Sequence, residues 1–176
     1  MRLVHDKRGA FNKVWKVSEE SHLGIAELFW SSSRRWVIRG MHVQMRPNAG
    51  RKVLWVSEGS IIDAVLDLRP ESATFAQWTV TELSQGEGAL TVPEQCAHGF
   101  LSISETATVH YAQEHPYRPD IEVGVLWDSF GLRWPVDHPI LSERDRKFPS
   151  FHDFIQANGL MAGLHSSSTT HEAGLP

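Results

Sequence analysis

Several features that would place a chain in a large protein class are absent from this sequence. Its 176 residues contain one cysteine, Cys96, which allows neither an internal disulfide nor a paired-cysteine zinc or redox motif. No apolar run approaches the roughly 18 residues of a membrane span, and the N-terminus lacks the apolar core of a signal peptide. These absences predict a cytoplasmic protein without a membrane partner, in which Cys96 is a small buried side chain.

A strong charge of either sign is also missing. The 17 basic and 21 acidic residues give a net charge of -4, and no basic run is long enough to bind nucleic acid. The length suits one domain that buries roughly two thirds of the surface of its unfolded chain. We expect a single domain over residues 1–160, followed by a disordered tail, because residues 161–176 have little apolar surface to bury.

Short apolar runs that recur about every ten residues are the main positive signal. This spacing is typical of an all-β sandwich or barrel. Helix is expected only as one turn near 142–147 and as a short segment within 150–159. The expected strands lie in 36–44, 52–57, 61–68, 75–83, 89–93, 99–104 and 107–112. The turn clusters between them lie at 47–50, 57–60, 69–72 and 84–88.

Polar residues interrupt the apolar strands at a few positions. Alternation along 36–44 places His42 and Gln44 on one face and Arg39 on the other, and both faces also carry apolar residues. The polar side chains are therefore either satisfied inside a core or line a cavity within a barrel. Asp63, in another apolar strand, needs a partner such as Lys52 or a histidine, because an unpaired buried charge is costly.

One pair of motifs resembles the cupins, a group of jelly-roll barrels. PEQCAH (93–98) matches the second cupin motif, Pro-x-Gly-x-x-His, with Gln95 in place of glycine. HVQ (42–44) matches the first, His-x-His, except that Gln44 replaces the second histidine. Two histidines are fewer than the three or four ligands of a usual transition-metal site. The resemblance implies a cupin-type double-stranded β-helix with short C-terminal helical segments, and disfavours a metal.

A longer series of motifs resembles the dTDP-4-dehydrorhamnose 3,5-epimerase family. The match runs in order and at family spacing from residue 6 to about 149. It consists of DKRGAF (6–11), VIRGMHVQ (37–44), KV (52–53), IDAVLDLR (62–69), SATFAQW (72–78), ELS (82–84), AHGF (97–100), VHY (109–111), GVLWD (124–128) and LSERD (141–145). A generic β pattern does not produce so many short motifs in register.

The resemblance implies roles for five residues in moving a proton at a carbon next to a ketone. His42 would be the base, and Asp145 would fix its tautomer. Tyr111 would donate a proton from the opposite side of the sugar. Lys52 and His98 would stabilise the enolate oxygen.

Other residues are implied in orientation and binding. Asp63 would pair with Lys52 or with His98. Arg8 and Arg39 resemble a diphosphate clamp, because the planar guanidinium presents paired donors. Phe11 and Gln44 are further candidates for substrate binding.

The chain departs from the family pattern where the nucleotide base would bind. Thymidine-binding members usually carry a Gln-x-Asn pair about fifteen residues before the motif histidine, where this chain has Glu27 and Phe29. They also carry a glutamate shortly after the first motif, where this chain has Lys13. A carboxylate at position 27 could accept from a base edge rich in N–H groups, such as guanine. Tyr117 is the candidate for stacking on the base.

The sequence therefore predicts a cofactor-independent epimerase that inverts C3, C5 or both in a nucleotide-diphosphate 4-keto-6-deoxy sugar. It is expected to act as a homodimer. The alternatives are a metal-dependent cupin enzyme and a catalytically silent sugar-binding cupin. The base, the carbon atoms inverted, the sugar and its pathway are left open.

Overall fold

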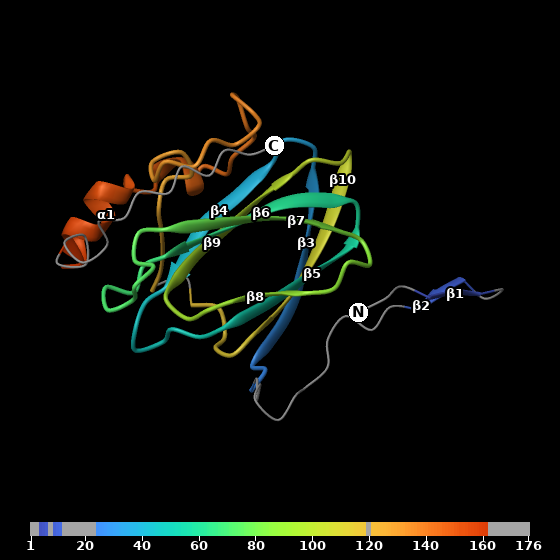
Figure 1. The fold of residues 1–176 in the computed structure, drawn as a ribbon, viewed down its shortest axis with the longest axis horizontal. Coiled ribbons are helices and arrows are strands. Elements are labelled where there is room, and N and C mark those ends of the chain that lie inside the picture. Colours follow the sequence, from blue (N-terminus) through green and yellow to red (C-terminus); the bar gives the residue numbers. More distant parts are fainter. Residues whose placement is uncertain (1–3, 7–8, 12–23, 119–120, 162–176) are drawn as a thin grey trace.

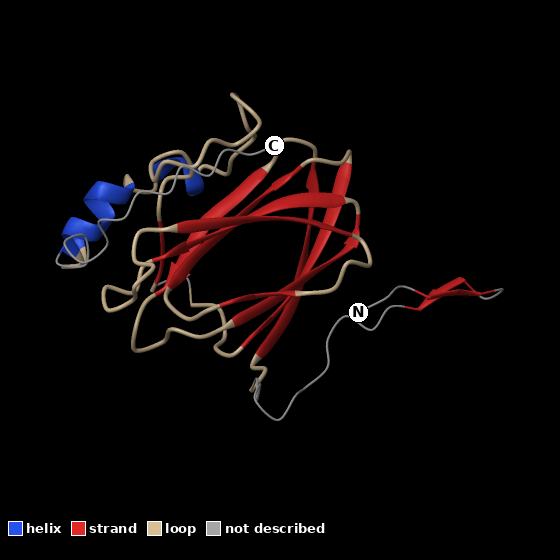
Figure 2. Cartoon of the chain, in the orientation of Figure 1, coloured by secondary structure: helices blue, strands red, loops and turns tan. Residues whose placement is uncertain are grey.

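The computed structural model describes residues 4–6, 9–11, 24–118 and 121–161, with side chains from residue 24 onward. Strands dominate these residues, and helix is confined to a C-terminal part (Figures 1 and 2). The strands are β1 (Val4–Asp6), β2 (Gly9–Phe11), β3 (Glu27–Arg34), β4 (Ile38–Gln44), β5 (Lys52–Glu58), β6 (Ser60–Asp67), β7 (Trp78–Ser84), β8 (Leu90–Val92), β9 (Cys96–Ser102), β10 (Thr106–Gln113) and β11 (Glu122–Gly124). The helices are the 3-10 turn η1 (Asp145–Lys147) and α1 (Phe151–Ala157).

Two antiparallel sheets face each other. One has the strand order β3-β10-β5-β8 and the other β11-β4-β9-β6-β7, while β1 and β2 pair separately. Strands adjacent in a sheet are mostly not consecutive in the chain, so the connections cross between the sheets. This is the predicted all-β jelly-roll barrel (Figure 1).

Most of the expected strands and turns are confirmed. β4 to β10 each overlap one apolar run, although β7 begins three residues later than expected, at Trp78, and β9 spans Cys96–Ser102 instead of 99–104. Gly59 and Gly86 occupy turns with positive φ of 75° and 86°. Only glycine fits at Gly59, where a Cβ atom would lie 2.1 Å from the Thr106 carbonyl oxygen. β3, β11 and the β1–β2 pair were not expected.

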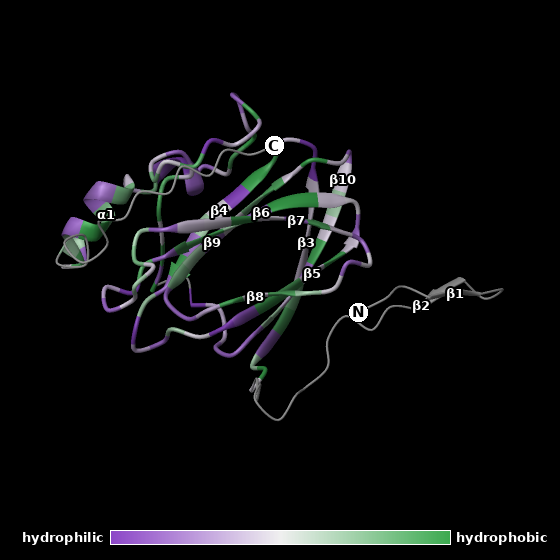
Figure 3. Ribbon diagram, viewed as in Figure 1, coloured by the Kyte–Doolittle hydropathy of each residue, from purple (hydrophilic) through white to green (hydrophobic). Residues whose placement is uncertain are grey.

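The barrel has two apolar clusters. One fills the space between the sheets and includes Leu54, Ile61, Cys96 and Phe100. The other covers the outer face of the five-stranded sheet with the C-terminal segment and includes both Leu66 and Phe154. In Figure 3 the strands carry hydrophobic stretches, whereas the loops are mainly hydrophilic. The five-stranded sheet is therefore apolar on both faces, and Cys96 is buried as predicted.

The predicted alternation along β4 is wrong. The pairing of β4 with β9 shifts register between Arg39 and His42, and Gly40 in between has a positive φ of 120°. A Cβ atom on Gly40 would lie 2.6 Å from the His98 carbonyl oxygen, so only glycine allows this close approach of the two strands. The irregularity turns Arg39 and His42 to the same side, while Met41 packs in the outer cluster.

The C-terminal segment follows the sequence prediction. η1 falls within 142–147 and α1 within 150–159. Ser150 caps α1, since its hydroxyl oxygen accepts from the backbone N–H of Asp153 at 3.2 Å. The expected tail, 161–176, lies outside the described residues apart from Met161. Within the part of the chain that is described, none of the helices has the length and hydropathy to cross a membrane.

Asp67 at the end of β6 anchors the following turn. Its carboxylate accepts from Arg69 at 2.7 and 2.9 Å and from the hydroxyls of Ser72 and Thr74 at 2.7 and 2.6 Å. Burial alone would raise the pKa of Asp67, but these donors outweigh it and hold the pKa well below 3.8. The ionised carboxylate therefore stabilises the fold above pH 3.8, and this contribution is lost as the pH falls through the lowered pKa.

Asp67→Asn should lower the free energy of unfolding at pH 7 by about 2 kcal/mol, because hydrogen bonds to a charged group are lost. Urea unfolding at pH 7 and at successively lower pH down to 3 checks this. The difference from the unmodified protein should shrink below pH 4. A difference that stayed constant over this range would contradict an ionic origin.

Candidate active site

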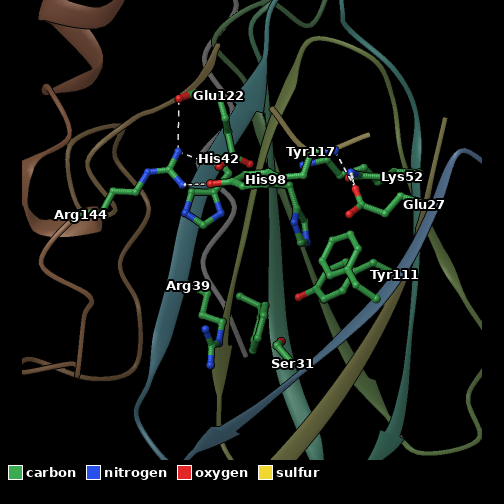
Figure 4. Close-up of a pocket in the computed structure, with 13 residues that line it drawn as sticks. Glu27, Ser31, Arg39, His42, Lys52, His98, Tyr111, Tyr117, Glu122 and Arg144 are labelled. Atoms are coloured by element: carbon green, nitrogen blue, oxygen red, sulfur yellow. Dashed lines mark hydrogen bonds and ion pairs between the residues drawn. The ribbon is translucent and has the colours of Figure 1, made fainter. Parts of the chain in front are cut away.

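A cavity of about 390 Å³ opens between the two sheets. Its size lies within the range of small-molecule sites. It is lined by Glu27, Phe29, Ser31, Arg39, His42, Lys52, His98, Phe100, Tyr111, Gln113, Tyr117, Glu122 and Arg144 (Figure 4). Most of the residues proposed from the sequence therefore meet in one place, although they come from strands far apart in the chain.

His42 on β4 is bound to Asp145 at the start of η1. The distance from His42 Nε2 to Asp145 Oδ1 is 2.9 Å, and Gly40 N–H donates to the other carboxylate oxygen at 3.2 Å. Burial would raise the pKa of Asp145, but the contacts with His42 and Gly40 outweigh it and lower that pKa below 3.8. An ionised Asp145 accepts the Nε2–H proton, which leaves Nδ1 of His42 as the basic nitrogen.

Tyr111 on β10 lies across the cavity from His42 (Figure 4). It is 7% exposed, and its hydroxyl points into the cavity. Burial raises the pKa of the Tyr111 phenol well above 10, while the Ser31 hydroxyl and the Arg39 guanidinium oppose the rise. The phenol is therefore protonated at neutral pH and can act as a proton donor.

His98 on β9 is bound to Asp63 on β6. The distance from His98 Nε2 to Asp63 Oδ2 is 2.6 Å, and both side chains are buried. Burial raises the pKa of Asp63, although His98 opposes this. The sequence left Lys52 or a histidine open as the partner of Asp63, and in the structure the partner is His98. Asp63 itself lies behind His98 and does not line the cavity.

Lys52 begins β5 and reaches the cavity. Burial lowers its pKa from 10.5, while Glu122 and Glu27 partly offset this effect. Among the described residues, no hydrogen bond or ion pair engages the Lys52 ammonium. Its N–H donors are therefore available to a bound ligand.

Arg39 on β4 is the residue of the predicted diphosphate clamp that the structure describes, and it lines the cavity. Its Nε donates to the Ser33 hydroxyl at 2.8 Å, and its Nη2 donates to the Ser32 carbonyl at 3.0 Å. Both contacts come from β3 and orient the planar group. Its remaining N–H donors are available to an anionic ligand.

Glu27 on β3 lies at the end of the cavity beside Lys52 and Tyr117 (Figure 4). Its Oε2 accepts from Gln113 Nε2 and from the backbone N–H of Tyr117, each at 2.7 Å. One carboxylate oxygen therefore holds the segment after β10 and is less free to bind a nucleotide base. Tyr117 lines the cavity and is 44% exposed, as a stacking residue requires.

Arg144 and Glu122 line the cavity but were not identified from the sequence. Arg144 Nη2 lies 2.7 Å from Glu122 Oε2, and its Nη1 donates to the Tyr117 hydroxyl at 3.0 Å. Arg144 precedes Asp145 in the LSERD motif, which was the one available signal. Together the two residues fix Tyr117 at the cavity mouth.

Gln44 does not line the cavity. Its amide is buried and donates to the Pro116 carbonyl at 3.3 Å, so it supports the segment that carries Tyr117. Substrate contact by Gln44 is therefore corrected to an indirect role. Arg8 and Lys13 lie outside the described residues, as does the side chain of Phe11.

The histidines that would be left from a cupin metal site face each other across paired strands, His42 opposite His98. Each has its Nε2 bound to a carboxylate, at 2.9 and 2.6 Å. Among the residues with described side chains, no group of three or more His, Cys, Asp or Glu is placed to hold a metal ion.

Comparison with known proteins shows the family. A family model described as dTDP-4-dehydrorhamnose 3,5-epimerase matches residues 1–153. The dTDP-4-dehydrorhamnose 3,5-epimerase of Shigella flexneri is 34% identical over 160 residues, which are 86% of this chain and 88% of the relative.

Solved structures give the same result. A dTDP-4-dehydrorhamnose 3,5-epimerase from Bacillus anthracis, with TDP and PPi bound, is 34% identical with a TM-score of 0.80 and covers 85% of this chain and 90% of its own. A 4-keto-6-deoxy sugar epimerase from the novobiocin gene cluster of Streptomyces spheroides is 30% identical with a TM-score of 0.83, covering 94% and 87%. The chain therefore belongs to the dTDP-4-dehydrorhamnose 3,5-epimerase family of nucleotide-sugar epimerases.

Proposed function

We propose that the chain inverts C3, C5 or both in a dTDP-linked 4-keto-6-deoxy sugar by removing and returning a proton through an enolate. The observation that carries the proposal is the placement of His42, bound to Asp145, and of Tyr111 on facing sides of one cavity (Figure 4). A base and an acid on opposite sides are what inversion at a carbon requires.

The first step is proton removal by His42. With Nε2–H directed to Asp145, the free Nδ1 takes the proton from the carbon next to the C4 ketone. The imidazolium that results lies 2.9 Å from the ionised carboxylate, which stabilises the new positive charge.

The second step is stabilisation of the enolate oxygen at C4. Lys52 supplies an ammonium that no described side chain neutralises by direct contact. When the His98–Asp63 pair as a whole is neutral, His98 carries a proton on Nδ1 and can donate it, whichever of the two side chains holds the proton shared across 2.6 Å. Fixed donors in a partly buried cavity stabilise a developing negative charge more strongly than water does.

The third step is protonation from the other side by Tyr111. The phenol is protonated at neutral pH, because burial raises its pKa. After the transfer, Ser31 and Arg39 lie where they can stabilise the tyrosinate. Proton exchange with solvent then restores both catalytic groups.

The nucleotide part of the substrate is proposed to be dTDP, since the Bacillus anthracis relative has TDP bound. Arg39 would bind the diphosphate, with Arg8 as a second candidate outside the described residues. Tyr117 would stack on the base. The alternative that Glu27 selects guanine is weakened by the contacts of its Oε2 with the protein's own donors.

Solvent deuterium incorporation tests the function. When the purified protein is mixed with a dTDP-linked 4-keto-6-deoxy sugar in D₂O, NMR should show loss of the proton signal at C3 or C5 of the sugar. GDP-, CDP- and UDP-linked substrates serve as comparisons. Absence of exchange with all four would reject the proposal, and activity that needs a stoichiometric bound metal would favour the metal-dependent alternative.

Lys52→Met should lower kcat/KM by about 10²- to 10³-fold, because one donor to the enolate oxygen is lost. The same change should raise the melting temperature, because a cation whose pKa is lowered by burial costs stability at neutral pH. Steady-state kinetics and thermal unfolding of one preparation check both results. Lower activity together with a lower melting temperature would point instead to damage of the fold.

Arg39→Met should weaken the stabilisation of the fold by free TDP. A ligand at a hundred times its Kd adds about 2.7 kcal/mol to the free energy of unfolding, so loss of a charged contact is visible as a smaller thermal shift. Arg35→Met is the matched control, since Arg35 binds the Ile103 carbonyl and does not line the cavity. Equal thermal shifts by TDP in both variants would show that Arg39 does not bind the nucleotide.

The expected homodimer has support in the outer face of β3. Leu28 and Trp30 are 65% and 64% exposed on the edge strand of the four-stranded sheet. Exposed apolar side chains of this size are typical of a surface that a partner covers. Light scattering after size exclusion tests the dimer, and fractionation of cells tests the predicted cytoplasmic location.

A further inference from the structure

Phe29 on β3 stacks against the catalytic phenol. It lies opposite Tyr111 in the β3–β10 register, with ring centroids 4.6 Å apart and an angle of 13° between the rings. Phe29 is 39% exposed and lines the cavity, whereas Tyr111 is 7% exposed. The ring of Phe29 therefore covers one face of the Tyr111 ring and shields it from solvent.

A second contact limits Tyr111 from another direction. The ring of His98 meets it edge to face, with centroids 6.4 Å apart and an angle of 74°. His98 is itself held by Asp63 at 2.6 Å. Rotation of the Tyr111 side chain would have to break the stack with Phe29 or move into His98. Its hydroxyl is thus kept at one place in the cavity.

The place of the hydroxyl matters because the reaction offers two carbons. C3 and C5 both flank the C4 ketone, and they lie roughly 2.5 Å apart across it, as two bonds of ordinary length require. A proton donor must come within hydrogen-bonding reach of the carbon that it serves. A donor fixed near one of these carbons is displaced from the other by most of that distance.

We propose that Phe29 is a positioning residue that, by holding Tyr111, makes inversion at one of the two carbons faster than at the other. This inference rests on the proposed function and deepens it. Phe29 acts through Tyr111 and needs no contact with the sugar. Loss of the stack would let the phenol shift between the two carbons.

Net inversion at each carbon, measured separately by NMR in a single turnover with a dTDP-linked 4-keto-6-deoxy sugar, tests the inference, because inversion, unlike deuterium exchange, requires the proton from Tyr111. The unmodified enzyme should favour one carbon by about tenfold or more, since a displacement of an ångström or two strongly slows a step that depends on orientation. Phe29→Leu keeps an apolar side chain without the stack and should move the ratio towards one. Phe29→Tyr keeps the stack and should preserve the ratio.

Trp36→Leu is the matched control, because Trp36 is an aromatic residue of similar exposure, 40%, in the turn before β4 and outside the cavity. Its ratio should equal that of the unmodified enzyme. Equal rates at both carbons in the unmodified enzyme, or an unchanged ratio in Phe29→Leu, would overturn the inference. No exchange at either carbon would instead reject the proposed function.

Discussion

His42→Asn is expected to abolish both epimerisation and deuterium exchange at the sugar, with a loss of at least about 10³- to 10⁴-fold in kcat/KM. Asparagine has no basic nitrogen, so neither carbon next to the ketone can lose its proton to this side chain. On the proposed path both exchange and inversion begin with proton removal by His42. The variant should therefore show no residual exchange. NMR in D₂O follows both processes in one sample.

The control for this variant is His110→Asn. His110 lies on the same strand as Tyr111 but outside the cavity, where its ring stacks on Trp55 with centroids 5.3 Å apart. Its loss should leave exchange near the level of the unmodified enzyme. Binding of free TDP by His42→Asn, measured as a thermal shift, shows whether the substrate site is intact. Full exchange in His42→Asn would assign the base to another residue.

The sequence predicted the strands in which apolar residues recur with a clear period and turn residues separate them. It did not predict β3 (Glu27–Arg34), because a run of serines and arginines follows its apolar start and hides the alternation. This strand contributes Phe29 and Ser31 to the cavity. The positions that flank the catalytic phenol were therefore absent from the predicted site.

The relative orientation of the Arg39 and His42 side chains was predicted wrongly from the sequence, for a different reason. Strict alternation places them on opposite faces, yet both line the cavity, because β4 changes register around Gly40. The cause is the close approach of Gly40 to β9, which depends on backbone geometry in two strands. No pattern within β4 alone reports such a contact.

The catalytic pairs could be proposed only in part from local patterns. His42 and Asp145 are separated by 103 positions in the sequence, and their contact was expected from the family resemblance alone. Asp63 was known to need a partner, because a buried charge without one is costly, and the structure has His98. Arg144 was missed, since an arginine in a polar segment is usually solvated.

Tyr111→Phe is expected to separate exchange from inversion. The base His42 and its partner Asp145 remain, so the enolate still forms and deuterium still enters from the side of His42 with retention of configuration. Inversion should fall by about 10²- to 10⁴-fold, because the donor on the opposite side is lost. The ring of phenylalanine keeps the stack with Phe29, whose centroid lies 4.6 Å from that of Tyr111, so the cavity wall should be preserved.

The informative comparison is the ratio of deuterium exchange to net inversion in the two catalytic variants. His42→Asn should lose both processes, whereas Tyr111→Phe should lose inversion and keep exchange. If Tyr111 were the base and His42 the acid, the two variants would show the opposite pattern. Removal of the buried hydroxyl should not unfold the protein. Because burial raises the pKa of the phenol, the group is uncharged at neutral pH, and the substitution removes no charge. Inversion at the unmodified rate by Tyr111→Phe would mean that the returning proton comes from solvent or from another side chain.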